Sequence, residues 1–217
     1  MASLDVADCI TEIKRICRIP DVTEYPASSD YYAMLRNAEN RVKRDAGMLC
    51  PNALWGSPTL LTSADGGYTY TFGTDGGSNA IEPIGQVAIY RNKANIPFYP
   101  MVSNEEYVYE SGKIRMTENV PRTFGDGPYA QFITPTYVID GSSNTMTLPY
   151  QWRMCAVYDA CAQYALSGGV LDPSPYQGLY AEELQRNVAS ARMNSTAGVI
   201  RFPRWQSGFH TNPYRFN

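Results

Sequence analysis

The chain has 217 residues, a mass of 24.2 kDa and a formal net charge of −3, with 44% hydrophobic and only 18% charged residues. This balance excludes a wholly disordered chain and predicts one globular domain with an elaboration. The 17 tyrosines and the few charges indicate a neutral surface suited to contact with other protein. The sequence has no signal-peptide pattern and no run of about 18 apolar residues, so we expect synthesis in a cytoplasm and no membrane partner.

Two amphipathic helices are predicted at the start of the chain. The first covers residues 5–18, where apolar residues recur at spacings of three and four and Pro20 ends the pattern. The second follows Ser28 and Ser29, which offer an N-cap, and Gly47 is its expected exit. The expected buried positions are Val6, Cys9, Ile10, Ile13 and Cys17 in the first helix, and Tyr31, Leu35, Ala38, Val42 and Ala46 in the second.

Residues 51–148 are expected to form a β-rich region. Most of the 17 glycines lie here, and Asp-Gly pairs at 65, 75, 126 and 140 indicate tight turns. Between the turns stand short runs rich in β-branched and aromatic residues. The expected strands are residues 68–72, 86–90, 107–109, 129–134, 136–139 and 145–148.

Two further helices are predicted after this region. Pro149 opens a helix over residues 150–166 that is apolar on most sides and therefore central, and the fourth helix covers residues 177–193. The predicted fold class is α+β: a bundle of about four helices with a β-rich insertion and an extended C-terminal arm. The predicted boundaries are 1–50 for the first two helices, 51–148 for the insertion, 149–193 for the last two helices, and 194–217 for the arm.

The C-terminal arm differs in composition from the rest of the chain. From Leu184 onward there are five arginines and no acidic residue, so the net charge of −3 leaves −8 on residues 1–183. Aromatic and arginine side chains are the usual anchors of buried protein interfaces, although they also stack on bases and neutralise phosphates. We expect the arm to dock on protein, with nucleic-acid binding and plain disorder as alternatives. The candidate docking residues are Arg201, Phe202, Arg204, Trp205, Phe209, Tyr214, Arg215 and Phe216.

The sequence offers no evident catalytic, cofactor or metal site. The only histidine, His210, lies in the arm, and the five cysteines contain no Cys-x-x-Cys pair, so neither a Ser-His or Cys-His pair nor a zinc site is indicated. The thiols are expected to be reduced core residues. Glu105 with Glu106, and Glu182 with Glu183, could serve a carboxylate-dependent hydrolase, but adjacent side chains point in different directions. We therefore expect no enzyme and no cofactor.

The order of these elements resembles the head-to-tail adaptor, or connector, proteins of tailed bacteriophages. The resemblance is carried by the run Asp30-Tyr-Tyr-Ala-Met-Leu-Arg-Asn-Ala-Glu-Asn-Arg41, by Leu148-Pro149-Tyr150 leading to Gln163-Tyr164-Ala165, and by the step Gly125-Asp126-Gly127-Pro128-Tyr129. It covers residues 1–193. The large insertion departs from the family pattern and leaves the tail-facing contacts open.

The resemblance implies a virion protein at the head-to-tail interface. Such proteins form a ring, usually a dodecamer, that binds beneath the portal protein and offers a platform for the tail tube or nozzle protein. Their bundles line the channel through which the genomic DNA passes during ejection, without specific binding, and C-terminal arms reach the portal. A tail tube or nozzle subunit is the first rival interpretation, and a virion-associated wall hydrolase is the second.

Overall fold

The computed structural model of the chain describes residues 5–20, 26–65, 68–74, 80–93, 96–110, 112–117, 128–141, 144–168 and 171–200. The helices are α1 (Val6–Cys17), α2 (Ser28–Leu49), α3 (Arg153–Gly168) and α4 (Ser174–Ile200), with the short 3-10 helices η1 (Pro51–Ala53) and η2 (Tyr150–Trp152). The strands are β1 (Thr59–Leu60), β2 (Thr62–Ser63), β3 (Thr69–Thr71), β4 (Ile84–Lys93), β5 (Ile96–Pro100), β6 (Tyr107–Glu110), β7 (Lys113–Met116) and β8 (Tyr129–Ile133).

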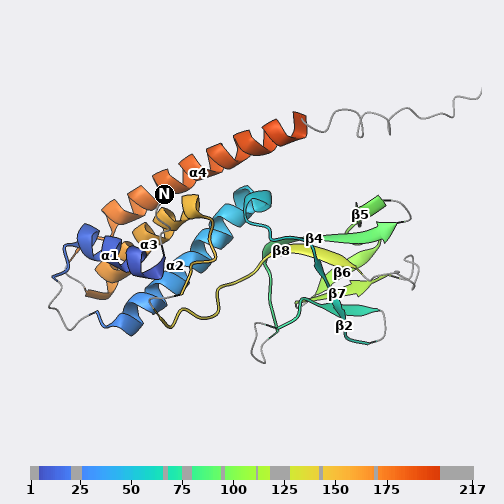
Figure 1. Cartoon of the computed structure of the whole chain (residues 1–217), viewed down its shortest axis with the longest axis horizontal. Coiled ribbons are helices and arrows are strands. Elements are labelled where there is room, and N and C mark those ends of the chain that lie inside the picture. Colours follow the sequence, from blue (N-terminus) through green and yellow to red (C-terminus); the bar gives the residue numbers. More distant parts are fainter. Residues whose placement is uncertain are drawn as a thin grey trace, which may run out of the picture.

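The four α-helices form a bundle, and the strands form a separate lobe at one end of it (Figure 1). Helix α3 contacts each of the other three α-helices, which gives it the central position predicted from its apolar sequence. With 49% of the residues helical and 21% in strands, the predicted α+β class is confirmed. The β lobe is inserted between α2 and α3, and the segment after β8 returns along the bundle before it enters α3 (Figure 1).

The buried stripes of the first two helices are largely as predicted. Helix α1 buries its predicted positions except Ile10, which is only partly buried, and it ends at Arg18 in the left-handed conformation with φ of 54°. Helix α2 buries all five predicted positions. Its N-cap is Ala27, not Ser28 or Ser29, because the Asp30 carboxylate accepts the Ala27 N–H at 2.9 Å and thereby closes the first turn.

Gly47 does not end α2, which continues to Leu49. A Cβ added to Gly47 would lie 2.6 Å from Cδ1 of Ile133, a buried residue at the end of β8. Helix α2 also contacts β4, the neighbour of β8 in its sheet. The glycine therefore lets the last turns of the helix approach the β lobe closely, at a known cost in helix propensity.

This contact predicts a compensation between two substitutions. Gly47→Ala alone is expected to gain up to about 1 kcal/mol of helix propensity and to lose it again through the clash with Ile133. Removing the clashing methyl with Ile133→Val should make Gly47→Ala stabilising in the double variant. Urea denaturation of the four proteins of this cycle measures the coupling, and strictly additive free energies of unfolding would contradict the contact.

The β lobe has two antiparallel sheets and its own hydrophobic core. The strand orders are β1-β8-β4-β5 and β2-β3-β7-β6, and the buried Leu61 lies where the chain passes from the first sheet to the second. Phe72 and Phe132 join the sheets by an edge-to-face contact with ring centroids 4.9 Å apart. The strands predicted at 68–72, 86–90, 107–109 and 129–134 are confirmed with shifted ends, whereas β1, β2, β5 and β7 were not predicted.

The fourth helix is longer than predicted. It begins at Ser174 and continues to Ile200, so residues 194–200, predicted as the start of the arm, are helical. The sequence contains no proline between Pro175 and Pro203. Because a proline disfavours helical backbone at the residue before it, the chain can remain helical until it approaches Pro203. The eight predicted docking residues of the arm, from Arg201 to Phe216, lie outside the described residues.

Candidate functional site

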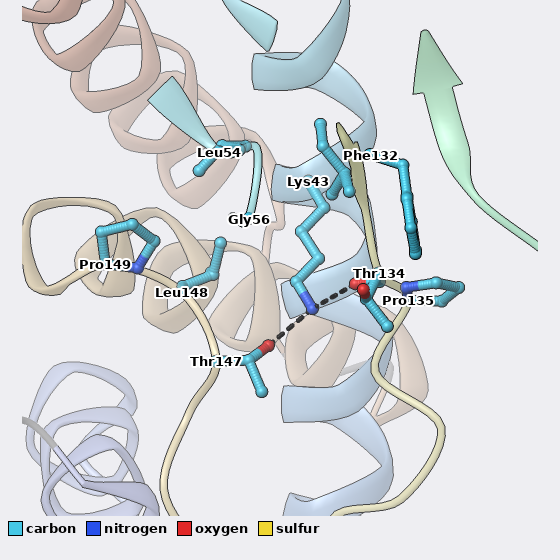
Figure 2. A pocket seen from close by; sticks show the side chains of 10 residues that line it. Lys43, Leu54, Gly56, Phe132, Thr134, Pro135, Thr147, Leu148 and Pro149 are labelled. Carbon is cyan, nitrogen blue, oxygen red and sulfur yellow. Dashed lines mark hydrogen bonds between the residues drawn. The ribbon is translucent and has the colours of Figure 1, made fainter. Parts of the chain in front are cut away.

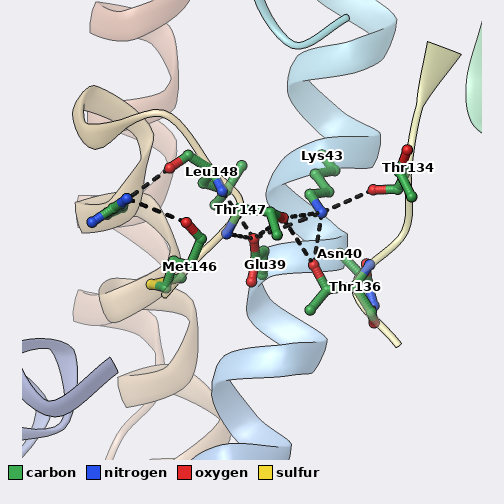
Figure 3. A network of polar contacts seen from close by, with 9 residues as sticks. Glu39, Asn40, Lys43, Thr134, Thr136, Met146, Thr147 and Leu148 are labelled. Carbon is green, nitrogen blue, oxygen red and sulfur yellow. Dashed lines mark hydrogen bonds and ion pairs between the residues drawn. The ribbon is translucent and has the colours of Figure 1, made fainter. Parts of the chain in front are cut away.

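The strongest polar constellation lies where the β lobe joins the bundle. Three residues of one α2 turn, Glu39, Asn40 and Lys43, face the segment 134–148, which returns from the lobe to α3 (Figure 3). Glu39 is fully buried and Lys43 is 5% exposed. Because buried ionic groups are costly unless paired and hydrogen-bonded, this cluster requires a complete set of partners. We call it the junction.

The Lys43 ammonium has three hydrogen bonds at the junction, all donated to threonines of the returning segment. They run to the Thr134 carbonyl at 2.8 Å, to the Thr136 hydroxyl at 2.7 Å and to the Thr147 hydroxyl at 2.6 Å. The Glu39 carboxylate lies 3.6 Å away. Burial lowers the pKa of Lys43, while the nearby Glu39 acts in the opposite direction. The amine thus joins two parts of the returning segment and has no proton left to offer a ligand.

Glu39 and Asn40 bind the backbone of the same segment. Oε1 of Glu39 accepts the Thr147 and Leu148 N–H groups at 2.8 and 2.9 Å. The Thr147 hydroxyl donates to the same oxygen at 2.5 Å. The Asn40 carboxamide accepts the Thr136 N–H at 2.7 Å and donates to the Thr136 carbonyl at 2.9 Å. Side chains of α2 therefore take the place of a partner strand.

This pairing corrects two predicted strands. Residues 136–139 and 145–148 form no strand, although both runs have β-branched residues at suitable spacing. Their polar backbone groups at the junction are satisfied by helix side chains instead of by a sheet ladder. Hydrophobic and β-branched patterning does not distinguish these two solutions, because both use extended backbone.

Arg153, at the start of α3, holds the returning segment from the other side. Its guanidinium donates to the Leu148 carbonyl at 3.0 Å and to the Met146 carbonyl at 3.2 Å, and it is 9% exposed. The segment is thus fixed between α2 and α3 just before the chain enters η2. The β lobe is attached to the bundle by a built polar contact in addition to the covalent connections.

A cavity of about 310 Å³ lies beside the junction (Figure 2). The described residues that line it are Lys43, Leu54, Gly56, Phe132, Ile133, Thr134, Pro135, Thr147, Leu148 and Pro149, and Lys43 is the only charged one among them. A catalytic lysine needs a free amine, but this amine is engaged by three acceptors. The arrangement supports a mechanical attachment of the lobe and provides no reactive group.

A second polar cluster fastens the helices to one another. Arg41 of α2 donates to the buried Asp159 of α3 at 2.5 Å, and its guanidinium lies 4.8 Å from the ring centroid of Tyr180 in α4. The Tyr180 hydroxyl donates to Asp45 at 2.6 Å, and burial is the largest cause of its raised pKa. One arginine of α2 thus contacts both α3 and α4, which helps to fix the relative position of the three helices.

The acidic pairs considered for a hydrolase do not form a shared site. Glu106 pairs with Arg91 at 2.8 Å, whereas its neighbour Glu105 is exposed. Glu183 pairs with Arg186 and accepts a hydrogen bond from Asn187 at 3.2 Å, whereas Glu182 is exposed. One member of each pair therefore has a structural partner and the other faces solvent, as the alternating directions of adjacent side chains require.

A groove of about 550 Å³ lies between the end of α2 and the outer part of α4. We call it the α2–α4 groove. Arg192 crosses from α4 to donate to the Leu49 carbonyl at 3.1 Å, which caps the C-terminal end of α2. The groove is lined by Leu49, Cys50, Pro51, Asn52, Ala53, Gln151, Ala191 and Arg192.

Sequence reasoning missed the junction and the groove. A signal for the junction was present, because Glu39 and Lys43 stand one position after the buried Ala38 and Val42 and are spaced four apart. An acidic and a basic residue that follow the buried stripe in this way indicate a buried ion pair. The groove has no such signal, since it joins residues of α2, η1, η2 and α4 that are far apart in the chain.

The fold and the junction define a helical bundle that carries a rigidly attached β lobe. Comparison of the sequence with models of known protein families gives no match, and comparison with characterised proteins gives none either. Within the part of the chain that the structure describes, no helix combines the length and the apolar composition needed to cross a bilayer.

Proposed function

We propose that the chain is a structural subunit of a bacteriophage head-to-tail adaptor ring, which joins the portal to the tail. The observation that carries this proposal is the combination of a compact bundle, a β lobe fixed to one end by the junction, and a helix α4 that leads into an arginine- and aromatic-rich segment. A subunit that transmits force between two assemblies needs such fixed attachments. No bond is made or broken in this role.

Ring formation would use the sides of the bundle. Large apolar side chains are exposed on α3, on α4 and on the loop between them: Leu166 (63%), Leu171 (37%), Leu179 (40%) and Met193 (72%). Exposed apolar side chains of this size are typical of protein contacts. A heterologous contact between neighbouring copies closes into a ring when the rotation between them divides a full turn, and twelve copies is the expected number.

The arm would bind the portal. In this proposal Phe202, Trp205, Phe209 and Phe216 are apolar anchors, Tyr214 adds a polar tip, and Arg201, Arg204 and Arg215 set the register against acidic groups. These residues lie outside the described part of the chain, so the assignment is based on composition. The β lobe would face the tail tube or nozzle protein.

The charge distribution supports a passage for DNA without specific binding. Residues 1–183 carry a net charge of −8, because the whole chain carries −3 and the remainder contains five arginines and no acidic residue. An acidic channel wall repels the phosphate backbone and lets it slide.

The helix content bears on the first rival. A tail tube or nozzle subunit is expected to use β-structure throughout, whereas this chain is 49% helical. The second rival, a wall hydrolase, is weakened by the separate engagement of the acidic pairs. We retain the adaptor as the function that the geometry supports best.

The first test is the mass of the purified protein, alone and mixed with the candidate portal ring, by light scattering coupled to size exclusion. The expected result is that the mass added to the portal is a discrete multiple of 24.2 kDa, with twelve copies as the expected number. A protein that stays a monomer and leaves the portal unchanged would remove the ring from consideration. As a control for nonspecific association, the same run is made with the portal ring and an unrelated protein.

A further inference from the structure

Apolar side chains that line the α2–α4 groove, or stand next to its lining residues in the chain, are unusually exposed. Met48 is 63% exposed, Leu49 is 45% exposed and Met193, next to Arg192 of the groove, is 72% exposed. Tyr150, next to Gln151 of the groove, is 50% exposed. Single exposed apolar residues are ordinary, but here Leu49 is exposed in the groove wall and three further exposed apolar residues adjoin lining residues in sequence, which favours a binding site. The groove volume of about 550 Å³ also falls within the range of about 300–1,000 Å³ typical of ligand pockets.

The chemistry of the groove favours an apolar occupant. Its walls are formed by Leu49, Cys50, Pro51, Ala53 and Ala191, with the amides of Asn52 and Gln151 beside them. Among the described residues that line the groove, Arg192 is the only charged one, and its guanidinium is bonded to the Leu49 carbonyl. None of the lining residues that the structure describes is acidic, so arginines would gain little there. Aromatic rings, whose π faces suit both apolar walls and guanidinium groups, would gain most.

A segment with such residues begins close by. Helix α4 passes the groove at Ala191 and Arg192 and ends at Ile200, eight residues or about 12 Å further along its axis. Residues 201–217 follow, and an extended chain spans about 3.3–3.6 Å per residue. About four residues are therefore enough to return to the groove, which brings Trp205 within reach and leaves Phe209 with length to spare.

We propose that, in the isolated chain, the α2–α4 groove binds the aromatic residues Trp205 and Phe209 of its own C-terminal arm. Tethering through α4 gives the arm an effective concentration in the millimolar range, so even a weak contact would be mostly formed. The groove thus shields the aromatic side chains until a partner of the arm competes for them. This inference concerns the chain alone and holds whether or not the partner is a portal.

Cys50 provides a direct probe of the contact. It lines the groove and is partly exposed, whereas the other four cysteines, Cys9, Cys17, Cys155 and Cys161, are buried. An uncharged maleimide should therefore label Cys50 first, and an occupied groove should slow that reaction. With a millimolar effective concentration and a dissociation constant near 0.1 mM, the arm would slow labelling about tenfold.

The experiment compares full-length proteins at one pH. The variant Trp205→Ser/Phe209→Ser is expected to be labelled at Cys50 about tenfold faster than the unchanged chain. The matched control Arg201→Ser/Arg204→Ser/Arg215→Ser alters the same arm and should react within about twofold of the unchanged chain, because the described lining of the groove contains no acidic partner. Intact mass must show a single label, and circular dichroism must be unchanged, so that unfolding is not the cause.

Two results would overturn the proposal. Equal labelling rates in the aromatic variant and the unchanged chain would mean that the arm does not occupy the groove. Protection that increases with protein concentration, from about 1 to about 100 µM, would assign the occupant to a second copy, because an intramolecular contact does not depend on concentration. Neither result depends on the portal experiment, so this inference and the proposed function can fail separately.

Discussion

Lys43→Met is expected to lower the free energy of unfolding by about 3–5 kcal/mol, because the substitution leaves the Glu39 carboxylate buried without its cation. Three acceptors of the returning segment, on Thr134, Thr136 and Thr147, lose their donor at the same time. Methionine preserves most of the side-chain volume, so the loss reports on the charge and its hydrogen bonds. Urea denaturation followed by circular dichroism measures the change.

The matched control is Arg44→Met, which removes a positive charge from the exposed neighbouring position of the same helix and should cost less than about 0.5 kcal/mol. Adding Glu39→Gln to Lys43→Met should recover part of the loss, with a coupling free energy of about 0.5–3 kcal/mol, because the uncompensated charge disappears. A Lys43→Met protein as stable as the Arg44→Met protein would show that the junction contributes nothing to stability.

Ending the chain after Ile200 is expected to reduce binding to the portal ring by at least about 100-fold, since two or more aromatic anchors of about 2 kcal/mol each are then removed. The position of the cut follows from α4, which continues to Ile200; a cut at residue 193 would also remove helical residues. Co-sedimentation of the shortened and full-length chains with the portal measures the difference.

The shortened chain should keep its helical circular dichroism signal, because the buried α4 residues Tyr180, Leu184 and Val188 precede the cut. A full-length chain with Arg201, Arg204 and Arg215 replaced by glutamine separates the arginines from the aromatic residues. We expect it to lose less affinity than the shortened chain and to show a weaker dependence on salt. Undiminished portal binding by the shortened chain would end the role assigned to the arm.

Much of the architecture was predictable because it depends on local patterns. The recurrence of apolar residues at three and four positions located α1, α2 and α4, the apolar run after Pro149 located α3, and the dense turn residues between 51 and 148 located the β lobe. The predicted order of bundle, insertion and bundle is the observed one. Each of these features is decided by residues close together in sequence.

Two of the failures, at Gly47 and at residues 136–139, share one physical cause, which is that the deciding partner is distant in the chain. A glycine such as Gly47 commonly follows the end of a helix, but Gly47 lies inside α2, where it packs closely against Ile133 of β8. Residues 136–139 have the composition of a strand, but the Asn40 carboxamide forms hydrogen bonds with the N–H and carbonyl of Thr136 that a neighbouring strand would otherwise pair. Local propensity is a weak preference, and a well-placed tertiary contact overrides it.

By itself, the sequence determined the fold class, the central position of α3 and the unusual composition of the C-terminal arm. Only the tertiary structure decided that Glu39, Asn40 and Lys43 hold the returning segment, and that Leu49, Cys50, Ala191 and Arg192 share one groove. The reason is that hydrophobic periodicity specifies which face of an element is buried, whereas the partner of each polar group depends on how the elements are placed in space.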